Sequence, residues 1–324
     1  MVILYNRNVY KEGITIYGMT KHSNMNGTRC PNCKGINVVR RGQRETENRG
    51  LIQRYGCKDC RKRFIENDGF WKMKNGSQKV TLCLDLFYKG VSTRQIQSHL
   101  QAFYPHNASW VSIYKWIVKY SKQISKFTDK IKVNTSPYVE MDEMEYHRRK
   151  SHKAKRGTDE NWFIDVIDPE TKFMIASKYC KSRSQNEVKR ILNIIKDKTE
   201  KIKIITTDGW LAYPNAIKKV FGYNNKTHQV NVIHNQKNAS KGDGFNYSIE
   251  RLHSNIRHRT KTFRGFHGCL SSASSIMKGY EIYYNFIREH QAIGKCPYEE
   301  ATNLKLENPN KWFELIKLSE QRNN

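Results

Sequence analysis

The sequence predicts a multidomain protein: a small β module, then an all-α module, then a larger α/β domain with a mixed sheet. The 324 residues are enough for about two or three domains. Two cysteine pairs lie near the N-terminus, and strand-like and helix-like segments alternate later in the chain. The predicted divisions are an unassigned N-terminal extension (1–27), the β module (28–66), the all-α module (72–127), the α/β domain (138–290) and a C-terminal tail (291–324).

The strongest bulk property is an excess of positive charge. The chain holds 58 Lys and Arg against 30 Asp and Glu, a formal net charge of +28. Nucleic acid is the simplest partner for such a chain, and the alternative is a merely basic surface. No run of about 18 apolar residues is present, so no transmembrane helix is expected. The N-terminus is too short and too interrupted for a signal peptide, so we expect a cytoplasmic protein.

Four of the eight cysteines form two Cys-x-x-Cys pairs, which predict a zinc ribbon. The pairs are Cys30/Cys33 and Cys57/Cys60, with 23 residues between them. Two hairpin turns with two thiolates each can surround one tetrahedral zinc ion. Zinc would stabilise a module too small to bury a sufficient core. Chance pairing or a redox role is the alternative. Residues 29–63 carry 11 Lys and Arg against 3 Asp and Glu, which fits phosphate contact, although zinc ribbons also contact proteins.

The all-α module reads as three helices. The first spans about 78–89 and ends at Gly90, Ser92 is the expected N-cap of the second, and Ser109 that of the third. Helix, short turn, helix, loop and helix is a helix-turn-helix arrangement, in which the third helix would lie in the major groove. A plain helical bundle or a dimerisation unit is the alternative. The DNA-contacting candidates at the start of the third helix are Ser109, Ser112, Tyr114 and Lys115.

The last large segment predicts an RNase H-like α/β domain. Three strand-like segments are followed by helix, strand, helix, strand and helix, which is the element order of that fold. The strands are expected at 138–149, 162–168, 173–180, 201–208 and 227–234, and the helices at 184–199, 213–221 and 246–266. A closing helix is expected at 271–290.

Three carboxylates in this domain suggest a metal site. Asp142 lies on the first strand, Asp208 ends the fourth, and Glu250 is the acid of a helix rich in Arg and Lys. Two divalent ions can activate a hydroxyl and stabilise a leaving oxygen in phosphoryl transfer, and Mg²⁺ prefers carboxylate oxygens. These three acids are therefore the predicted ligands.

Other acids near these positions are alternative candidates for the site. Strand alternation places Glu140 with Asp142 on one face, and Glu143 with Glu145 on the other. The pattern leaves open which face holds the site. The remaining rivals, which we read as turn, strand-end or loop acids, are Asp165, Asp168 and Asp243.

Two further residues are candidates for DNA contact. Arg257 follows Glu250 by seven residues, two helical turns along the same face, where a cation can hold the scissile phosphate. The alternative is a solvent-facing arginine. Trp210 follows Asp208 by two residues and can stack on an unpaired base, although a packing role is the more ordinary reading.

Three segments of the sequence resemble the motifs of a known family. MDEMEY, TTDGWLAYPNAI and NYSIERLHSNIRHRTKTFRGF are similar to the three motifs of the DDE transposases of prokaryotic insertion sequences. The family pattern has an Asp-Glu pair on the first strand, then Thr-Asp-Gly, then Asn-x-x-x-Glu followed by basic residues and Arg-Gly-Phe. The resemblance covers roughly residues 28–290, because a zinc ribbon and a helix-turn-helix also precede this domain in several such families.

The resemblance implies an RNase H-like fold with Asp142, Asp208 and Glu250 as catalytic metal ligands and Arg257 as the basic residue after the glutamate. It further implies two Mg²⁺ or Mn²⁺ ions per active site, beside the one structural Zn²⁺. The implied partners are double-stranded DNA, at the transposon ends and the target, and further copies of the chain in a homo-oligomer. The implied setting is the nucleoid of a prokaryotic cell. The implied reaction is hydrolysis at the transposon end, followed by attack of the freed 3′-OH on target DNA.

Two other functions compete with this one. The first is a DNA-binding regulator with a decayed α/β domain, which the intact set of three acids disfavours. The second is an RNase H-like nuclease without strand transfer, which the N-terminal DNA-reading modules disfavour.

Overall fold

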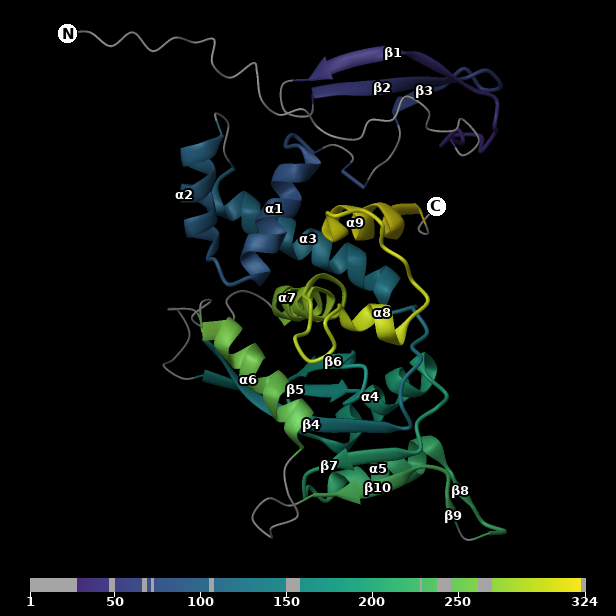
Figure 1. The fold of residues 1–324 in the computed structure, drawn as a ribbon, viewed down its shortest axis with the longest axis vertical. Coiled ribbons are helices and arrows are strands. Elements are labelled where there is room, and N and C mark those ends of the chain that lie inside the picture. The colour runs from purple at the N-terminus through teal and green to yellow at the C-terminus, as the bar shows by residue number, and fades with distance from the viewer. Residues whose placement is uncertain are drawn as a thin grey trace, which may run out of the picture. The chain divides into compact units, whose positions relative to one another are not determined.

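The structure is a computed structural model (Figure 1) that describes residues 28–46, 50–65, 69–70, 73–104, 108–149, 158–227, 229–237, 246–261 and 270–321. The chain divides into two compact units, Met1–Glu66 and Asn67–Asn324. No helix among these residues is both long enough and apolar enough to cross a membrane.

The first unit contains a three-stranded antiparallel sheet. Its strands are β1 (Val38–Thr46), β2 (Gly50–Cys57) and β3 (Arg63–Ile65), in the order β1-β2-β3. The prediction of a β module at this point of the sequence is confirmed. Among the described residues of the unit, the only buried side chains counted as hydrophobic are two cysteines, Cys30 and Cys57. The sheet therefore has almost no apolar core of its own.

The second unit begins with the three predicted helices, α1 (Ser77–Tyr88), α2 (Thr93–Phe103) and α3 (Trp110–Thr128). Ser92 caps α2 through a capping box with Gln95, as its position before an apolar-periodic run predicts. Ser109 caps α3 by accepting a hydrogen bond from the Ser112 amide at 3.3 Å. The starts of α2 and α3 were thus readable from local sequence.

Helices from the C-terminal part of the chain complete this helical layer. They are α7 (Leu270–Ile282), the π-helix η3 (Tyr283–Ile287), α8 (Pro297–Ala301) and α9 (Lys311–Gln321). α7 packs along α3, and α9 packs against both α1 and α3. The predicted tail at 291–324 thus contributes two helices, α8 and α9, and in α9 Trp312, Leu315 and Ile316 are buried.

The central sheet of the second unit has five strands in the order β10-β7-β4-β5-β6. They are β4 (Tyr138–Arg149), β5 (Thr158–Ile167), β6 (Met174–Cys180), β7 (Ile204–Thr207) and β10 (Ile233–Gln236). β4, β5 and β6 are antiparallel neighbours, whereas β7 runs parallel to β4, and β10 runs parallel to β7. This mixed sheet with its helices resembles the RNase H-like core that the sequence predicts.

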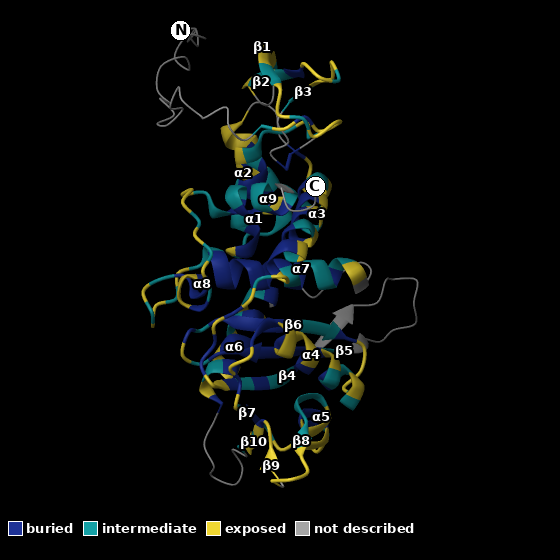
Figure 2. Ribbon diagram, turned by 90° about the vertical axis from the view of Figure 1, so that its right-hand side faces the viewer, coloured by how far each residue is buried: buried dark blue, intermediate teal, exposed yellow. Residues whose placement is uncertain are grey.

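The helices lie on both faces of the sheet. α4 (Gln185–Lys198) and α5 (Ala212–Phe221) pack on each other, with α4 against β6 and α5 against β10. α6 (Tyr247–Lys261) crosses β4 and β5 (Figure 1). In Figure 2, buried residues run through the central strands, while the small hairpin of β8 (Tyr223–Asn224) and β9 (Gln229–Val230) is exposed.

The strand expected at 227–234 is divided in two. Gln229–Val230 pairs with β8 in the hairpin, and only Ile233–Gln236 joins the central sheet. Between them, the side-chain Nδ2 of Asn231 donates to the carbonyl oxygen of Phe221 at 2.9 Å and holds a bend. The prediction of one continuous strand at 227–234 is therefore wrong.

The edge strand β6 is covered by a side chain rather than by another strand. The Asn285 side chain accepts from the Met174 amide and donates to the Met174 carbonyl oxygen, each at 2.8 Å. Asn285 lies in η3 and is 1% exposed. It satisfies part of an edge that would otherwise offer unpaired backbone groups.

Candidate active site

The position of Asp208 follows from the lengths of two neighbouring strands. β7 ends at Thr207, while β4, paired with it in parallel up to Glu140↔Thr206, continues to Arg149. Asp208 therefore lies just beyond the end of its own strand and beside the middle of β4. Its Oδ1 accepts from the Trp210 amide at 3.0 Å, which holds the turn that follows the strand.

Three carboxylates meet at this point. Asp142, Glu143 and Asp208 each offer an oxygen, and these oxygens lie within 4.8 Å of one another. Two of them were predicted as metal ligands, and Glu143 was assigned to the opposite face of β4. Asp208 follows Thr207, the last residue of β7, so no strand residue separates it from either face of β4. Acids on both faces of β4 therefore lie near it. The Asp-Glu pair in the sequence was the signal for Glu143, but strand alternation argued against joining the two.

Glu143 is the most deeply buried acid of this acidic cluster. Its side chain is 1% exposed, against 23% for Asp142 and 45% for Asp208. Burial raises the pKa of Glu143, and the two neighbouring aspartates act in the same direction. The Tyr213 hydroxyl and the Arg183 guanidinium oppose this rise in pKa. The acidic cluster therefore concentrates negative charge that a cation would stabilise.

A histidine of α6 holds Asp142 from the other side. His253 Nδ1 lies 3.5 Å from Asp142 Oδ2, and His253 Nε2 lies 3.1 Å from Asp165 Oδ2. Burial alone would lower the pKa of His253, but its hydrogen bonds to the two aspartates raise it to about 9. Asp165, which pairs with Asp142 in the register of β4 and β5, is fully buried. His253 was not among the predicted site residues, and Asp165, predicted as a turn or strand-end acid, instead lies within β5.

Glu250 is not part of the acidic cluster. α6 starts close to β4, because the Ile249 amide donates to Glu140 Oε2 at 2.9 Å. Glu250 is nevertheless exposed, one turn before the buried His253, and Arg257 is exposed two turns further on. The structure therefore brings together two of the three predicted acids, and places Glu250 and Arg257 on the exposed side of the helix that contacts Asp142.

The four cysteines of the first unit come together as predicted from their spacing. Their sulfur atoms lie within 4.8 Å of one another, with 3.5 Å between Cys30 and Cys60 and between Cys33 and Cys57. The residue after each pair has a positive φ, 59° at Lys34 and 61° at Arg61, which turns the chain around the sulfurs. A backbone hydrogen bond from Lys62 lowers the pKa of the Cys60 thiol to about 6. A set of four convergent sulfurs fits a tetrahedral zinc ion.

The predicted DNA-contacting residues of α3 lie in its first two turns. Ser109 and Ser112 form the cap, with their Oγ atoms 3.1 Å apart. Lys115 is exposed and Tyr114 is half-buried. α3 is tied to α2 at this end, because the Trp110 amide donates to Gln97 Oε1 at 2.7 Å.

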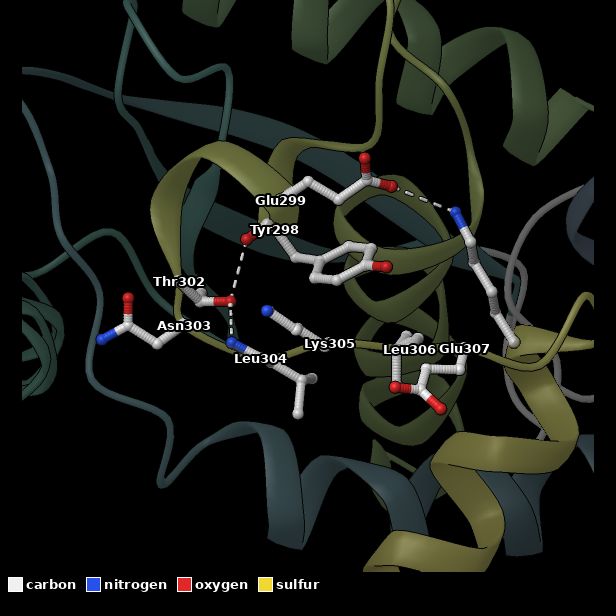
Figure 3. Close-up of a pocket in the computed structure, with 9 residues that line it drawn as sticks. Tyr298, Glu299, Thr302, Asn303, Leu304, Lys305, Leu306 and Glu307 are labelled. Carbon is white, nitrogen blue, oxygen red and sulfur yellow. Dashed lines mark hydrogen bonds and ion pairs between the residues drawn. The ribbon is translucent and has the colours of Figure 1, made fainter.

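A separate hollow lies beside α8 (Figure 3). Its volume is about 640 Å³ and it is lined by residues 298–299 and 302–307 and by Lys311, none of which is a predicted site residue. Lys311 bridges its wall by contacting Glu299 at 3.2 Å.

Part of the α/β domain is similar to a known protein family. Residues 155–290 match the family model for the DDE domain of IS240-type transposases. This match includes Asp208 and Glu250, while Asp142 precedes it. No match is found among curated proteins.

Several solved structures are similar to the chain. The integrase catalytic core domain of HTLV-2, solved with magnesium, is 14% identical with a TM-score of 0.35, over 52% of this chain and 97% of that one. The simian T-cell lymphotropic virus intasome is 9% identical with a TM-score of 0.36, over 71% and 74%. The Drosophila P element transposase strand transfer complex is 9% identical with a TM-score of 0.34, over 82% and 81%.

The family match includes the second and third sequence motifs, with Asp208 and Glu250, whereas the first motif, with Asp142, precedes it. The predicted resemblance is confirmed for residues 155–290, which match a DDE domain.

Proposed function

We propose that this chain is a transposase that binds the ends of its own insertion sequence, cleaves them in a metal-dependent reaction and joins the freed 3′-OH to target DNA. The observation that carries the proposal is the convergence of Asp142, Glu143 and Asp208 within 4.8 Å at the end of β7. The DDE-domain match of residues 155–290 supports a polynucleotidyl transferase rather than a binding protein.

The residues present fit divalent cations. Three carboxylates offer hard oxygen ligands of the kind that Mg²⁺ and Mn²⁺ prefer, and the burial of Glu143 leaves charge there that water stabilises poorly. Asp142 and Asp208 would be the main ligands, with Glu143 beside them. Two ions held there would supply an activated hydroxyl and a stabilised leaving oxygen.

Glu250 and Arg257 are proposed to act from α6. His253, one turn after Glu250, holds this helix against Asp142, which supports a role for α6 at the site. We assign Glu250 to the ligand shell of the second ion and Arg257 to the scissile phosphate. Trp210 is assigned to an unpaired base next to the cleavage point.

DNA recognition is proposed for the two N-terminal modules. The zinc ribbon and the helices α1 to α3 would bind the element ends, with α3 in the major groove. The contacts there would come from Ser109, Ser112, Tyr114 and Lys115. The net charge of +28 favours this partner. Because two ends must be joined, the active form is proposed to be a homo-oligomer assembled on DNA inside the cell.

The test is cleavage of a supercoiled plasmid that carries the element's own ends, with Mg²⁺ present. The wild-type chain should nick at the ends, whereas Asp208→Asn should bind the same ends and leave them intact, because it weakens metal binding without touching the DNA-reading modules. Asp197→Asn, which changes an exposed aspartate at the end of α4, is the matched control and should cleave normally.

The competing functions give different results in the same assay. End binding without cleavage by either protein would support the regulator. Cleavage without joining of a supplied 3′-OH end would support a simple nuclease. Cleavage by Asp208→Asn at the wild-type rate would contradict the assignment of this carboxylate.

A further inference from the structure

Arg183 lies at the acidic cluster without having been part of the predicted site. It belongs to the short connection between β6 and α4, immediately before Ser184, which caps α4 by accepting from the Glu187 amide at 3.4 Å. The cap fixes the end of this connection. Arg183 is thereby directed back toward β4 and β7 rather than along the helix.

The guanidinium of Arg183 contacts two acids of the acidic cluster. Its Nε and Nη2 lie 3.4 Å from the two carboxylate oxygens of Glu143, and Nη2 lies 3.4 Å from Asp208 Oδ2. A planar guanidinium with several N–H donors can bridge two carboxylates in this way, which an ammonium group does less well. Arg183 therefore links the β4 acid to the β7 acid.

Two indoles hold the same guanidinium. The Arg183 Cζ lies 4.4 Å from the ring centroid of Trp210 and 5.4 Å from that of Trp162. Trp210 is itself fixed by its amide hydrogen bond to Asp208. Aromatic faces attract a cation and keep it partly out of water. The Arg183 side chain is accordingly only 33% exposed.

Charge balance makes Arg183 and a metal ion competitors. The three carboxylates lie close enough to repel one another, and Arg183 is the cation that contacts two of them. A divalent ion on Glu143 and Asp208 would need the same oxygens and would repel the guanidinium at close range.

We propose that Arg183 is a positioning residue that acts as the resident counter-cation of the acidic cluster. It holds Glu143 and Asp208 together in the metal-free chain, and divalent metal binding displaces its guanidinium from the carboxylates. This inference rests on the proposed function only in taking the acidic cluster as the metal site. Its test needs no DNA cleavage.

The experiment measures Mn²⁺ binding to the zinc-loaded chain by the loss of the electron paramagnetic resonance signal of free Mn²⁺. Arg183→Gln should bind Mn²⁺ about tenfold more tightly, because a positive charge beside the ligands is removed. The Mn²⁺ affinity of Arg183→Lys should lie between that of the wild-type chain and that of Arg183→Gln. Arg190→Gln is the matched control. It removes an arginine of the following helix, α4, whose described ion pair is with Glu187, and its Mn²⁺ affinity should stay near the wild-type value.

Tryptophan fluorescence gives a second readout. Titration of the wild-type chain with Mg²⁺, which does not quench indoles, should change the emission as the guanidinium leaves Trp210 and Trp162. Arg183→Gln should lose this change, while Arg190→Gln keeps it. A merely structural role of Arg183 would alter the far-ultraviolet circular dichroism without tightening metal binding.

Mn²⁺ affinity of Arg183→Gln equal to or weaker than that of Arg190→Gln would overturn the proposal, whether or not the chain cleaves DNA. If the Mn²⁺ result is as expected but the plasmid assay shows no cleavage, the proposed function fails and the role of Arg183 stands.

Discussion

At the scale of single residues, the site combines consecutive acids with cations from distant segments. Asp142 and Glu143 point to opposite faces of β4, and each meets a cationic partner on its own face: His253 of α6 for Asp142 and Arg183 before α4 for Glu143. Asp208, beyond the end of β7, lies near the carboxylates of both residues. Glu143 is therefore as well placed for metal binding as the two predicted aspartates.

If Glu143 takes part in metal binding, its substitution should reduce metal affinity or DNA cleavage, which the three predicted ligands alone do not imply. Glu143→Gln should lower metal affinity or cleavage about 10–100-fold, the usual cost of altering the shell of a metal site. Mn²⁺ titration and the plasmid assay measure the two effects. Glu145→Gln, the exposed acid two residues along the same strand, is the control and should change neither. Unchanged affinity in Glu143→Gln would leave Asp142 and Asp208 as the only ligands from β4 and β7.

At the scale of elements, close helix contact joins the α/β sheet to the helical layer. Tyr88 of α1 shares a hydrogen bond of 2.8 Å with Ser121 of α3 and donates to the Ile276 carbonyl oxygen of α7 at 3.2 Å. This approach is possible because residue 279 is glycine: a Cβ there would lie 1.9 Å from the Tyr88 hydroxyl oxygen. α7 in turn contacts β6.

Gly279→Ala should therefore destabilise the second unit. The extra methyl group overlaps the Tyr88 hydroxyl and the Ser121 hydroxyl, at 1.9 Å and 2.3 Å, so the helices must separate. Overpacking of this kind costs about 1–3 kcal/mol, measured by urea unfolding of the full chain. Combining Gly279→Ala with Tyr88→Phe removes the closest overlapping atom and should recover part of the loss. Gly294→Ala introduces a methyl group into open space, at a positive φ, and tests backbone strain without overlap.

At the scale of the whole molecule, the two units depend on different sources of stability. The second unit has a continuous apolar core through its sheet and helices, whereas two cysteines make up the buried hydrophobic set of the described first unit. The first unit therefore relies on the ion that its four sulfurs would hold.

Cys57→Ser should release zinc and unfold residues 28–66 without unfolding the second unit, since the chain divides at Glu66. Zinc content by atomic absorption should fall below one ion per chain, and limited proteolysis should cut within the ribbon first. Cys83→Ser changes a buried cysteine of α1 outside the sulfur cluster and should retain zinc. Retention of one zinc ion per chain in Cys57→Ser would contradict the zinc-ribbon interpretation.

Local patterns in the sequence were sufficient for the elements and for the kind of chemistry. Capping serines, apolar periodicity and cysteine spacing act over a few residues, so they predicted α1 to α3, the three strands β4 to β6 and the sulfur cluster. The acidic motifs predicted a metal-dependent site that includes Asp142 and Asp208.

Only the tertiary structure decided which side chains surround those acids. Arg183 and Asp208 are 25 residues apart, and Tyr88 and Ile276 are 188 apart, so no local pattern encodes either contact. The length of β7 relative to β4 set the meeting of Asp142, Glu143 and Asp208, and that length depends on where the two strands pair. Contacts between distant segments depend on packing. For this reason the roles of Glu143, His253 and Arg183 became visible only in the fold, whereas the acidic motifs could be recognised in the sequence.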